Sequence, residues 1–261
     1  MKKKFLVASE GETDFEVVKA ALERAGQLTG DRYSVKPIFP DARSKQHAGW
    51  TNLRAWLQDQ AVSHAGKKNR IAAATALNPK LNAIPNVPNF KADKISAALA
   101  LNSDGYDRCA LIVQLDTDVA EAFMEDAGLG AVHICPLHPN DRLKVAERAL
   151  DNWLGGHAGK RNTQIYYCTA LLALETWILA LHDEPSIRKV WPLPAAPVEY
   201  EHIHRPDRLL VELGYPKDSP IKLRKTAGLY KQYGAKVANA LAVARGRSAQ
   251  LDALCTFANA L

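Results

Sequence analysis

One stretch of the chain, residues 108–115, constrains the fold more than any other. It contains Cys109-Ala110-Leu111-Ile112-Val113, five apolar residues with no polar residue between them. A strand with one face in water would alternate apolar and polar side chains. An uninterrupted run is instead typical of a central parallel strand that is covered on both faces.

Strand and helix patterns alternate through the first 180 residues. Short apolar runs predict further strands at residues 3–8, 33–39, 131–135 and 164–168. Apolar residues at helical spacing predict helices at residues 15–25, 51–64, 93–101, 140–153 and 169–182, with Gly26 and Gly30 ending the first of these. The alternation predicts an α/β layer fold with a mainly parallel sheet flanked by helices.

The second half of the chain changes character near residue 185. We expect residues 1–184 to form one domain, with an irregular, proline-containing insertion at about residues 66–92. Residues 185–261 are expected to form a proline-rich connector and a basic, helical C-terminal extension. Its helical part, residues 223–260, is predicted as two pieces broken near Gly246.

Composition excludes several classes of protein. Apolar residues make up 47% and charged residues 24% of the chain, which is ordinary for a folded domain and excludes disorder of the whole. No run approaches the ~20 apolar residues of a membrane span. The four cysteines are far apart and form no CxxC pair, so we expect reduced core residues of a cytoplasmic protein that does not contact a membrane.

The net charge of +6 favours polyanionic partners, and the basic residues concentrate near the C-terminus. A phosphate backbone lying along this region would contact several of them. The candidates are Lys222, Arg224, Lys225, Lys231 and Lys236. An ordinary solvated helical face explains the same residues equally well.

Acidic residues follow two of the predicted strands directly. Asp116 and Asp118 close the apolar strand, and Glu10 follows the strand at residues 3–8. Because the carboxyl ends of parallel strands meet at one edge of a sheet, these side chains are expected to lie together. Oxygen ligands suit Mg²⁺, and a bound cation would remove the repulsion between like charges.

A milder interpretation remains open for each acidic segment. Asp-x-Asp after a strand also occurs in solvated turns. Acidic residues near a helix N-terminus interact favourably with the backbone dipole, and Glu12 and Asp14 are expected there for that reason.

A strand ending in Glu10-Gly11-Glu12-Thr13-Asp14, followed later by one ending in Asp116-Thr117-Asp118, resembles the Toprim domain of topoisomerases, primases and OLD-family nucleases. The first segment is most similar to small stand-alone Toprim-like proteins found beside bacterial phage-defence ATPases. The motifs span about a tenth of the chain, and the implied Rossmannoid topology spans residues 1 to about 180. Nothing after residue 185 carries the resemblance.

The resemblance implies a nuclease that hydrolyses phosphodiester bonds of DNA or RNA with Mg²⁺ or Mn²⁺. Glu10 would be a metal ligand and general base, and Asp116 and Asp118 would hold one or two ions. Glu175, in an apolar helix, would be a further ligand, or it would accept a bond from Trp177 or from a nearby lysine. Lys144 and Lys160 are candidates for the lysine that many such nucleases need. An antiviral role and an ATPase partner are further expectations from the resemblance.

Two other functions fit the same residues. One is a non-catalytic module that binds nucleic acid or a partner protein through a degenerate Toprim fold. The other is a phosphotransferase or primase-like enzyme that uses the same carboxylates on nucleotides.

Overall fold

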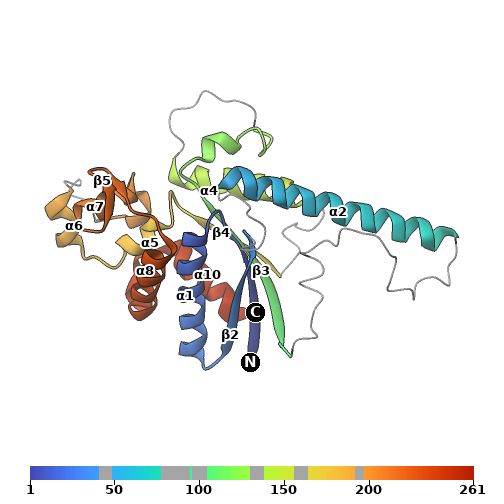
Figure 1. Cartoon of the computed structure of the whole chain (residues 1–261), viewed down its shortest axis with the longest axis horizontal. Helices are drawn as coiled ribbons and strands as arrows, with labels where there is room; N and C mark the ends of the chain where they lie inside the picture. The colour runs from blue at the N-terminus through green and yellow to red at the C-terminus, as the bar shows by residue number, and fades with distance from the viewer. Residues whose placement is uncertain (41–48, 78–94, 96–104, 130–137, 156–163, 192–196) are drawn as a thin grey trace.

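The fold is built on a four-stranded parallel sheet with strand order β2-β1-β3-β4. The computed structural model describes residues 1–40, 49–77, 95, 105–129, 138–155, 164–191 and 197–261. The strands are β1 (Lys2–Ala8), β2 (Arg32–Phe39), β3 (Arg108–Asp116) and β4 (Ile165–Ala170). Figure 1 shows the sheet between two layers of helices.

The apolar run of β3 is explained by burial on both sides. Ala110 and Ile112 belong to one hydrophobic cluster, and Leu111 and Val113 belong to another. Successive side chains of a strand point to opposite faces, so only a strand covered twice needs apolar residues at every position. The predicted α/β fold with a parallel sheet flanked by helices is confirmed.

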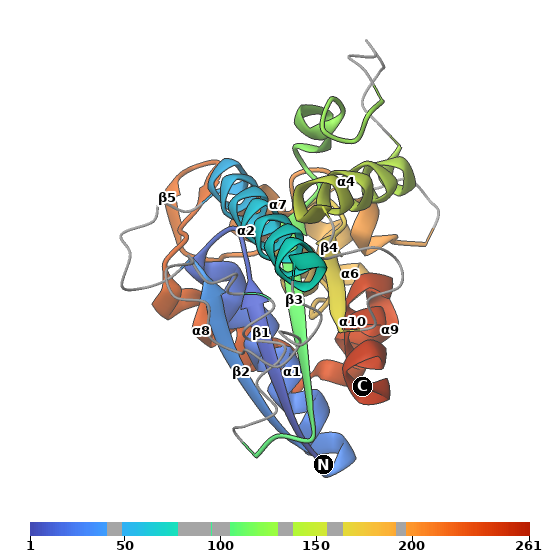
Figure 2. The same cartoon turned by 90° about the vertical axis from the view of Figure 1, so that its right-hand side faces the viewer.

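Different helices cover the two faces (Figures 1 and 2). The first cluster lies under α1 (Glu12–Thr29), α8 (Ala227–Asn239) and α10 (Ala249–Ala260). The second lies under α2 (Trp50–Leu77), the short 3-10 helix η3 (Ala120–Phe123) and α4 (Pro139–Leu154). The C-terminal helices therefore complete one half of the core.

The remaining elements form a small lobe beside the sheet, at the left of Figure 1. They are α5 (Glu175–Leu179), α6 (Glu184–Val190), η5 (Tyr200–His202), α7 (Pro206–Glu212), β5 (Lys217–Ser219) and β6 (Lys222–Leu223). Helix α9 (Leu241–Arg247) instead lies beside α10, as Figure 2 shows. Residues on both sides of position 185, such as Trp177 and Leu209, share the first hydrophobic cluster. The C-terminal region is helical, as predicted, and it packs against the sheet domain instead of standing apart from it.

The chain termini are joined by a buried lysine. The ammonium of Lys3 donates to the carbonyls of Ala258 (3.0 Å) and Asn259 (2.9 Å) and pairs with Asp31 (3.3 Å). The Lys3 side chain is only 1% exposed, so these acceptors compensate the charge that folding removes from water.

Several sequence expectations about helix ends are wrong. Gly26 lies inside α1, packed under the ring of Tyr33, and the helix ends at Gly30, whose left-handed conformation (φ 74°) suits glycine. Helix α2 continues past residue 64 to Leu77, because the Ala-rich segment before the first proline of the expected insertion is compatible with a helix.

Two further helical regions differ from what the sequence predicts. The helix expected over residues 169–182 is shorter, since residue 170 still belongs to β4 and α5 begins at Glu175. The C-terminal region forms three helices, with breaks at Ala240 and Ser248, and Gly246 lies within α9. Ser248 caps α10, and a residue that caps one helix cannot continue the one before it.

Some expectations fall outside the described residues. These are the strand at residues 131–135, the insertion from residue 78 onward, Lys160, Cys135 and all of the helix at 93–101 except Ile95. The other three cysteines are buried and free. In the described part of the chain, no helix is both long enough and apolar enough to cross a membrane.

We predict that two glycines of α8 respond oppositely to alanine. A Cβ at Gly234 would lie 2.9 Å from the Glu16 carbonyl oxygen in α1, whereas a Cβ at Gly228 would meet nothing within 4 Å. Gly228→Ala should leave the free energy of unfolding unchanged or raise it by up to ~1 kcal/mol through helix propensity. Gly234→Ala should lower it by about 1–3 kcal/mol through overpacking. Urea unfolding measures both, and equal effects would contradict the close packing of α1 on α8.

Candidate functional site

The strand order places a topological switch between β1 and β3. From β1 the chain goes to β2 on one side, and it returns to place β3 on the other side. In open parallel sheets, ligands bind beyond the carboxyl ends of the strands at such a point. Glu10 follows β1 and Asp116 is the last residue of β3, so both lie at this switch.

A closed set of hydrogen bonds joins the two strand ends. The Asp116 amide donates to Oε1 of Glu10 (2.7 Å), and the Glu10 amide donates to Oε1 of Gln114 (3.2 Å). The Gln114 side chain in turn donates to Oδ1 of Asp116 (2.8 Å). Residues more than a hundred positions apart are thereby held side by side, and Gln114, which is fully buried, fixes the Asp116 carboxylate.

The loop after β3 carries Asp118 to the exposed rim of this edge. Thr117 is buried and its hydroxyl accepts a bond from the Leu172 amide (2.8 Å), while the Asp118 amide donates to the Leu172 carbonyl (2.7 Å). The guanidinium of Arg142, from α4, donates to the carbonyls of Thr117 (2.8 Å) and Asp118 (3.0 Å). The Asp118 backbone is therefore fixed, while its side chain is exposed to solvent.

Two further carboxylates lie behind the strand ends. Asp14, in the first turn of α1, is buried, and Glu175, which begins α5, is 1% exposed. Glu175 Oε1 pairs with the ammonium of Lys225 (2.7 Å) and accepts a hydrogen bond from the Tyr230 hydroxyl. Its Oε2 is buried without a hydrogen-bond partner.

The electrostatics of the four acids at the strand ends and α1 follow from burial and mutual repulsion. Burial raises the pKa of Glu10 to about 8, against the bond from the Asp116 amide and with repulsion from Asp14 and Asp118. Burial and repulsion by Glu175 raise the pKa of Asp14 to about 7.

The pKa values of Asp116, at the end of β3, and of Asp118, in the loop after it, are raised as well. The pKa of Asp116 lies well above its ordinary value, mainly through burial and then through repulsion by Asp14 and Glu10. Desolvation also raises the pKa of Asp118, partly offset by Lys225.

Lys225 is the nearest counter-charge to this group. Partial burial works to lower the pKa of its ammonium, but the attraction of Glu175 and of the other carboxylates outweighs burial and raises that pKa. Lys225 therefore stays protonated and neutralises part of the acidic charge.

The all-oxygen donor set fits a hard divalent cation, since Mg²⁺ takes carboxylate oxygens and keeps several waters. The unpartnered Oε2 of Glu175 and the raised pKa values of Glu10 and Asp116 are what such a set shows without a cation. As the side chains lie, however, no three acidic, histidine or cysteine side chains in the described ranges are arranged around one coordination point. One oxygen of Glu10 is engaged by the Asp116 amide, and one oxygen of Glu175 by Lys225 and Tyr230.

The predicted nucleic-acid-binding residues do not share one environment. Lys225 enters the carboxylate cluster through Glu175. Arg224 pairs with Asp218 (2.8 Å) on the surface, and Lys236 lies 5.5 Å from the ring centroid of Tyr215. Lys222 and Lys231 are exposed. Lys144, the described candidate for a site lysine, pairs with Asp141 on α4.

Sequence reasoning missed three members of the site, and it placed a fourth, Lys225, among nucleic-acid-binding residues instead of beside Glu175. Asp14 carries a carboxyl into the buried cluster, although the sequence pattern assigned it to the helix dipole. Gln114 lies inside the apolar strand, where one buried amide two residues before Asp116 was the available signal. Lys225 and Tyr230 are separated from Glu175 by 50 or more residues, and no local pattern pairs them with it.

Comparisons with known proteins give this site no precedent: no protein-family model, curated protein or solved structure matches the chain. The chemistry of the site is therefore argued from its own residues.

We predict that the cation-free protein loses stability as the pH rises. The folded state holds protons on Glu10 and Asp14 up to pH values of about 8 and 7, whereas ordinary values for these groups are 4.5 and 3.8. Folding therefore takes up protons between these limits, and the stabilisation present at low pH is lost as the pH rises through the folded-state values. With EDTA present, Tm should fall by several degrees between about pH 5.5 and about pH 8.

Millimolar Mg²⁺ should raise Tm most at the higher pH, where the carboxylates are ionised and free of competing protons. Glu10→Gln should flatten the pH dependence, and Glu12→Gln, on the exposed side of the same turn, should leave it unchanged. Differential scanning calorimetry across this pH range measures all three. A Tm that rises with pH in EDTA would contradict the buried-carboxylate account.

Proposed function

We propose that this chain is a Toprim-like, metal-dependent nuclease. One observation carries the proposal: Glu10 and Asp116 are joined by a 2.7 Å hydrogen bond at the carboxyl ends of two adjacent central strands. Asp118 lies at the rim beside them, and Asp14 and Glu175 interact electrostatically with the same group. A cluster of buried acids at a topological switch is costly to a fold, which favours a role in binding cations and phosphates.

Glu10, Asp116 and Asp118 would hold Mg²⁺ or Mn²⁺, with Glu175 as a further ligand or as the partner that positions Lys225. When bound, the ion polarises a scissile phosphate and lowers the pKa of water. Gln114 holds the Asp116 carboxylate in one orientation through its 2.8 Å hydrogen bond. With a pKa of about 8, Glu10 is mostly protonated at neutral pH while no cation is bound; a bound cation would displace that proton, and the carboxylate could then accept one from water.

Lys225 supplies the positive group that this chemistry needs. Its side chain is 49% exposed while its ammonium pairs with a carboxylate that is 1% exposed, so it extends from the solvent into the cluster. A phosphodiester bound at the rim would find this cation next to the acids, and the charge would stabilise the developing negative charge of in-line attack. An antiviral role and an ATPase partner rest on the resemblance alone.

A non-catalytic nucleic-acid-binding module is the second candidate, and one observation favours it. One oxygen of each of Glu10, Asp116 and Glu175 is already engaged by protein donors, which are the Asp116 amide, the Gln114 side chain, and Lys225 with Tyr230. A site satisfied in this way needs no cation to fold. Binding would then depend on Lys222, Lys231 and other exposed basic residues.

We predict that Asp116→Asn abolishes cleavage while leaving the fold intact. The amide keeps the Oδ1 acceptor for Gln114 but removes the charge that a cation needs. Cleavage should fall by more than the ~10–100-fold that loss of an outer-shell partner costs a metal site. The measurement is cleavage of plasmid, single-stranded DNA and tRNA with Mg²⁺ and with Mn²⁺.

The matched control is Asp141→Asn, which neutralises an exposed acid on α4 and should retain full activity. Circular dichroism should give the same helical content for both variants and for the wild type. Full cleavage by Asp116→Asn would reject the assigned site.

A chelation experiment separates the two candidate functions. If the chain is a nuclease, EDTA abolishes cleavage, and Mg²⁺ restores it in the wild type but not in Glu10→Gln. If it is only a binding module, no substrate is cleaved under any condition, and DNA binding in EDTA weakens steeply with added salt through counterion release. Fluorescence anisotropy and gel-based cleavage of one labelled strand measure both properties on the same sample.

A further inference from the structure

A concave site lies along α8, from Leu229 to Lys236. It is a cavity of about 340 Å³ between α8, the segment joining α7 to β5, and His182 after α5. Apolar residues Leu213 and Leu229 line part of it, and its polar lining comes from His182, Gln232 and Lys236. The volume is at the lower end of those that enclose a small molecule, so it has room for one compact ligand.

Two tyrosines form the aromatic part of the lining. The rings of Tyr215 and Tyr233 have centroids 5.1 Å apart in an edge-to-face arrangement. The Tyr215 hydroxyl is held by Nε2 of His182 at 3.0 Å, which fixes the ring. Rigid aromatic faces of this kind are the usual platforms for nucleobases, because every base presents a π-face.

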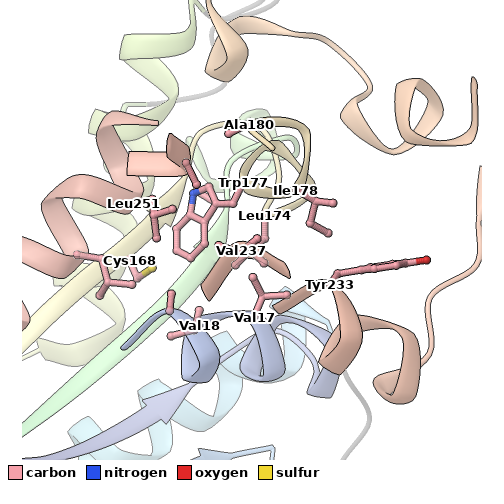
Figure 3. Close-up of a cluster of buried hydrophobic side chains, with 14 of the residues drawn as sticks. Val17, Val18, Cys168, Leu174, Trp177, Ile178, Ala180, Tyr233, Val237 and Leu251 are labelled. Atoms are coloured by element: carbon pink, nitrogen blue, oxygen red, sulfur yellow. The ribbon is translucent and has the colours of Figure 1, made fainter. Parts of the chain in front are cut away.

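Among the described residues, the hydroxyl of Tyr233 has no hydrogen-bond partner. The residue is 3% exposed, and its oxygen is buried without a hydrogen bond. Figure 3 shows the hydroxyl pointing away from the apolar side chains around Trp177 and Val17, and Tyr233 is among the residues that line the cavity. A buried hydroxyl without a partner is costly, and a rotation of the Tyr233 ring toward the cavity would let a ligand satisfy it.

The charge of the lining favours an anion. Lys236 lies 5.5 Å from the Tyr215 ring centroid and 6.0 Å from that of Tyr233, and none of the described residues that line the cavity is acidic. Burial, together with the positive charge of Lys236, lowers the pKa of His182, so the imidazole stays neutral at physiological pH. Lys236 is thus the cation of the lining, and Gln232 offers an amide with both donor and acceptor atoms.

We infer that this cavity binds one nucleotide unit, with its base against the ring of Tyr215, beside Tyr233, and its phosphate at Lys236. Helix α8 connects it to the carboxylate cluster: the Tyr233 and Tyr230 ring centroids are 5.4 Å apart, and the Tyr230 hydroxyl bonds Glu175. The inference rests on the proposed function for one point, that the nucleotide belongs to the strand being cut. The cavity would then hold a nucleotide near the cleaved bond and position the strand.

Ligand binding measured in EDTA tests the inference independently of cleavage, because no divalent cation can then occupy the carboxylate cluster. Calorimetry would compare a nucleoside monophosphate, its nucleoside, inorganic phosphate and a short single-stranded oligonucleotide. Lys236→Ala should weaken the monophosphate about tenfold, equivalent to about 1.4 kcal/mol, and the nucleoside much less. Tyr233→Phe keeps the ring and removes only the unpartnered hydroxyl, so it should fold normally and weaken both ligands.

The matched control is Lys189→Ala, which removes an exposed lysine of α6 that is not part of the cavity lining. It should leave the monophosphate affinity unchanged. Binding of the free monophosphate, or of the oligonucleotide alone, supports the inference and distinguishes a free nucleotide from a strand as the source.

Two results would overturn it. One is the absence of binding by both nucleotide ligands. The other is binding that is equally tight for inorganic phosphate, or that is unaffected by Lys236→Ala and Tyr233→Phe. Cleavage measured separately with Mg²⁺ keeps the two proposals distinct: a protein that cuts DNA but fails the EDTA test retains the nuclease function and loses this site.

Discussion

Repulsion between buried carboxylates at one edge of a parallel sheet is the interaction on which the rest of the molecule depends. Glu10, Asp14 and Asp116 share a region where burial disfavours their charged forms. A fold tolerates such a group only when protons, cations or hydrogen-bond donors compensate it. Gln114, the Asp116 amide, Lys225 and Tyr230 supply donors here. The raised pKa values of Glu10 and Asp14 indicate that this compensation is incomplete without protons or a cation.

The C-terminal region belongs to both the core and the site. Helix α8 packs on α1 so closely that Gly234 has no room for a side chain beside the Glu16 carbonyl. The same helix carries Tyr230 to Glu175, and Lys225 comes just before its N-terminus. Packing and electrostatics are therefore coupled, because a shift of α8 would expose the first hydrophobic cluster and leave Glu175 without its cation. The cavity at Tyr233 and Lys236 lies on the same helix and depends on the same contact.

The two candidate functions differ in what completes the charge balance. In a nuclease, a divalent cation takes part of the negative charge, and Lys225 becomes available to a phosphate. In a binding module, Lys225 and the hydrogen-bond donors are enough to compensate the negative charge, and the acids have only a structural role at the edge of the sheet. The buried Oε2 of Glu175, which no protein donor reaches, favours the first. The lack of three convergent ligands in the described part of the chain favours the second. Both observations follow from the same placement of the strand ends.

The sequence by itself determined the central strands and the proximity of the acids that follow them. The unbroken apolar run of β3 and the alternation of strands with helices are local patterns, and parallel strands bring Glu10 and Asp116 together although 106 residues separate them. Only the tertiary structure decided that Asp14 is buried, that Lys225 and Tyr230 reach Glu175, and that a cavity forms at Tyr233. Those contacts depend on how α8 docks on α1 and α5, and helix periodicity gives the apolar face of a helix without giving its partner. Helix ends such as Gly26 were misjudged for a related reason, since the packing of Tyr33 over that glycine keeps it helical.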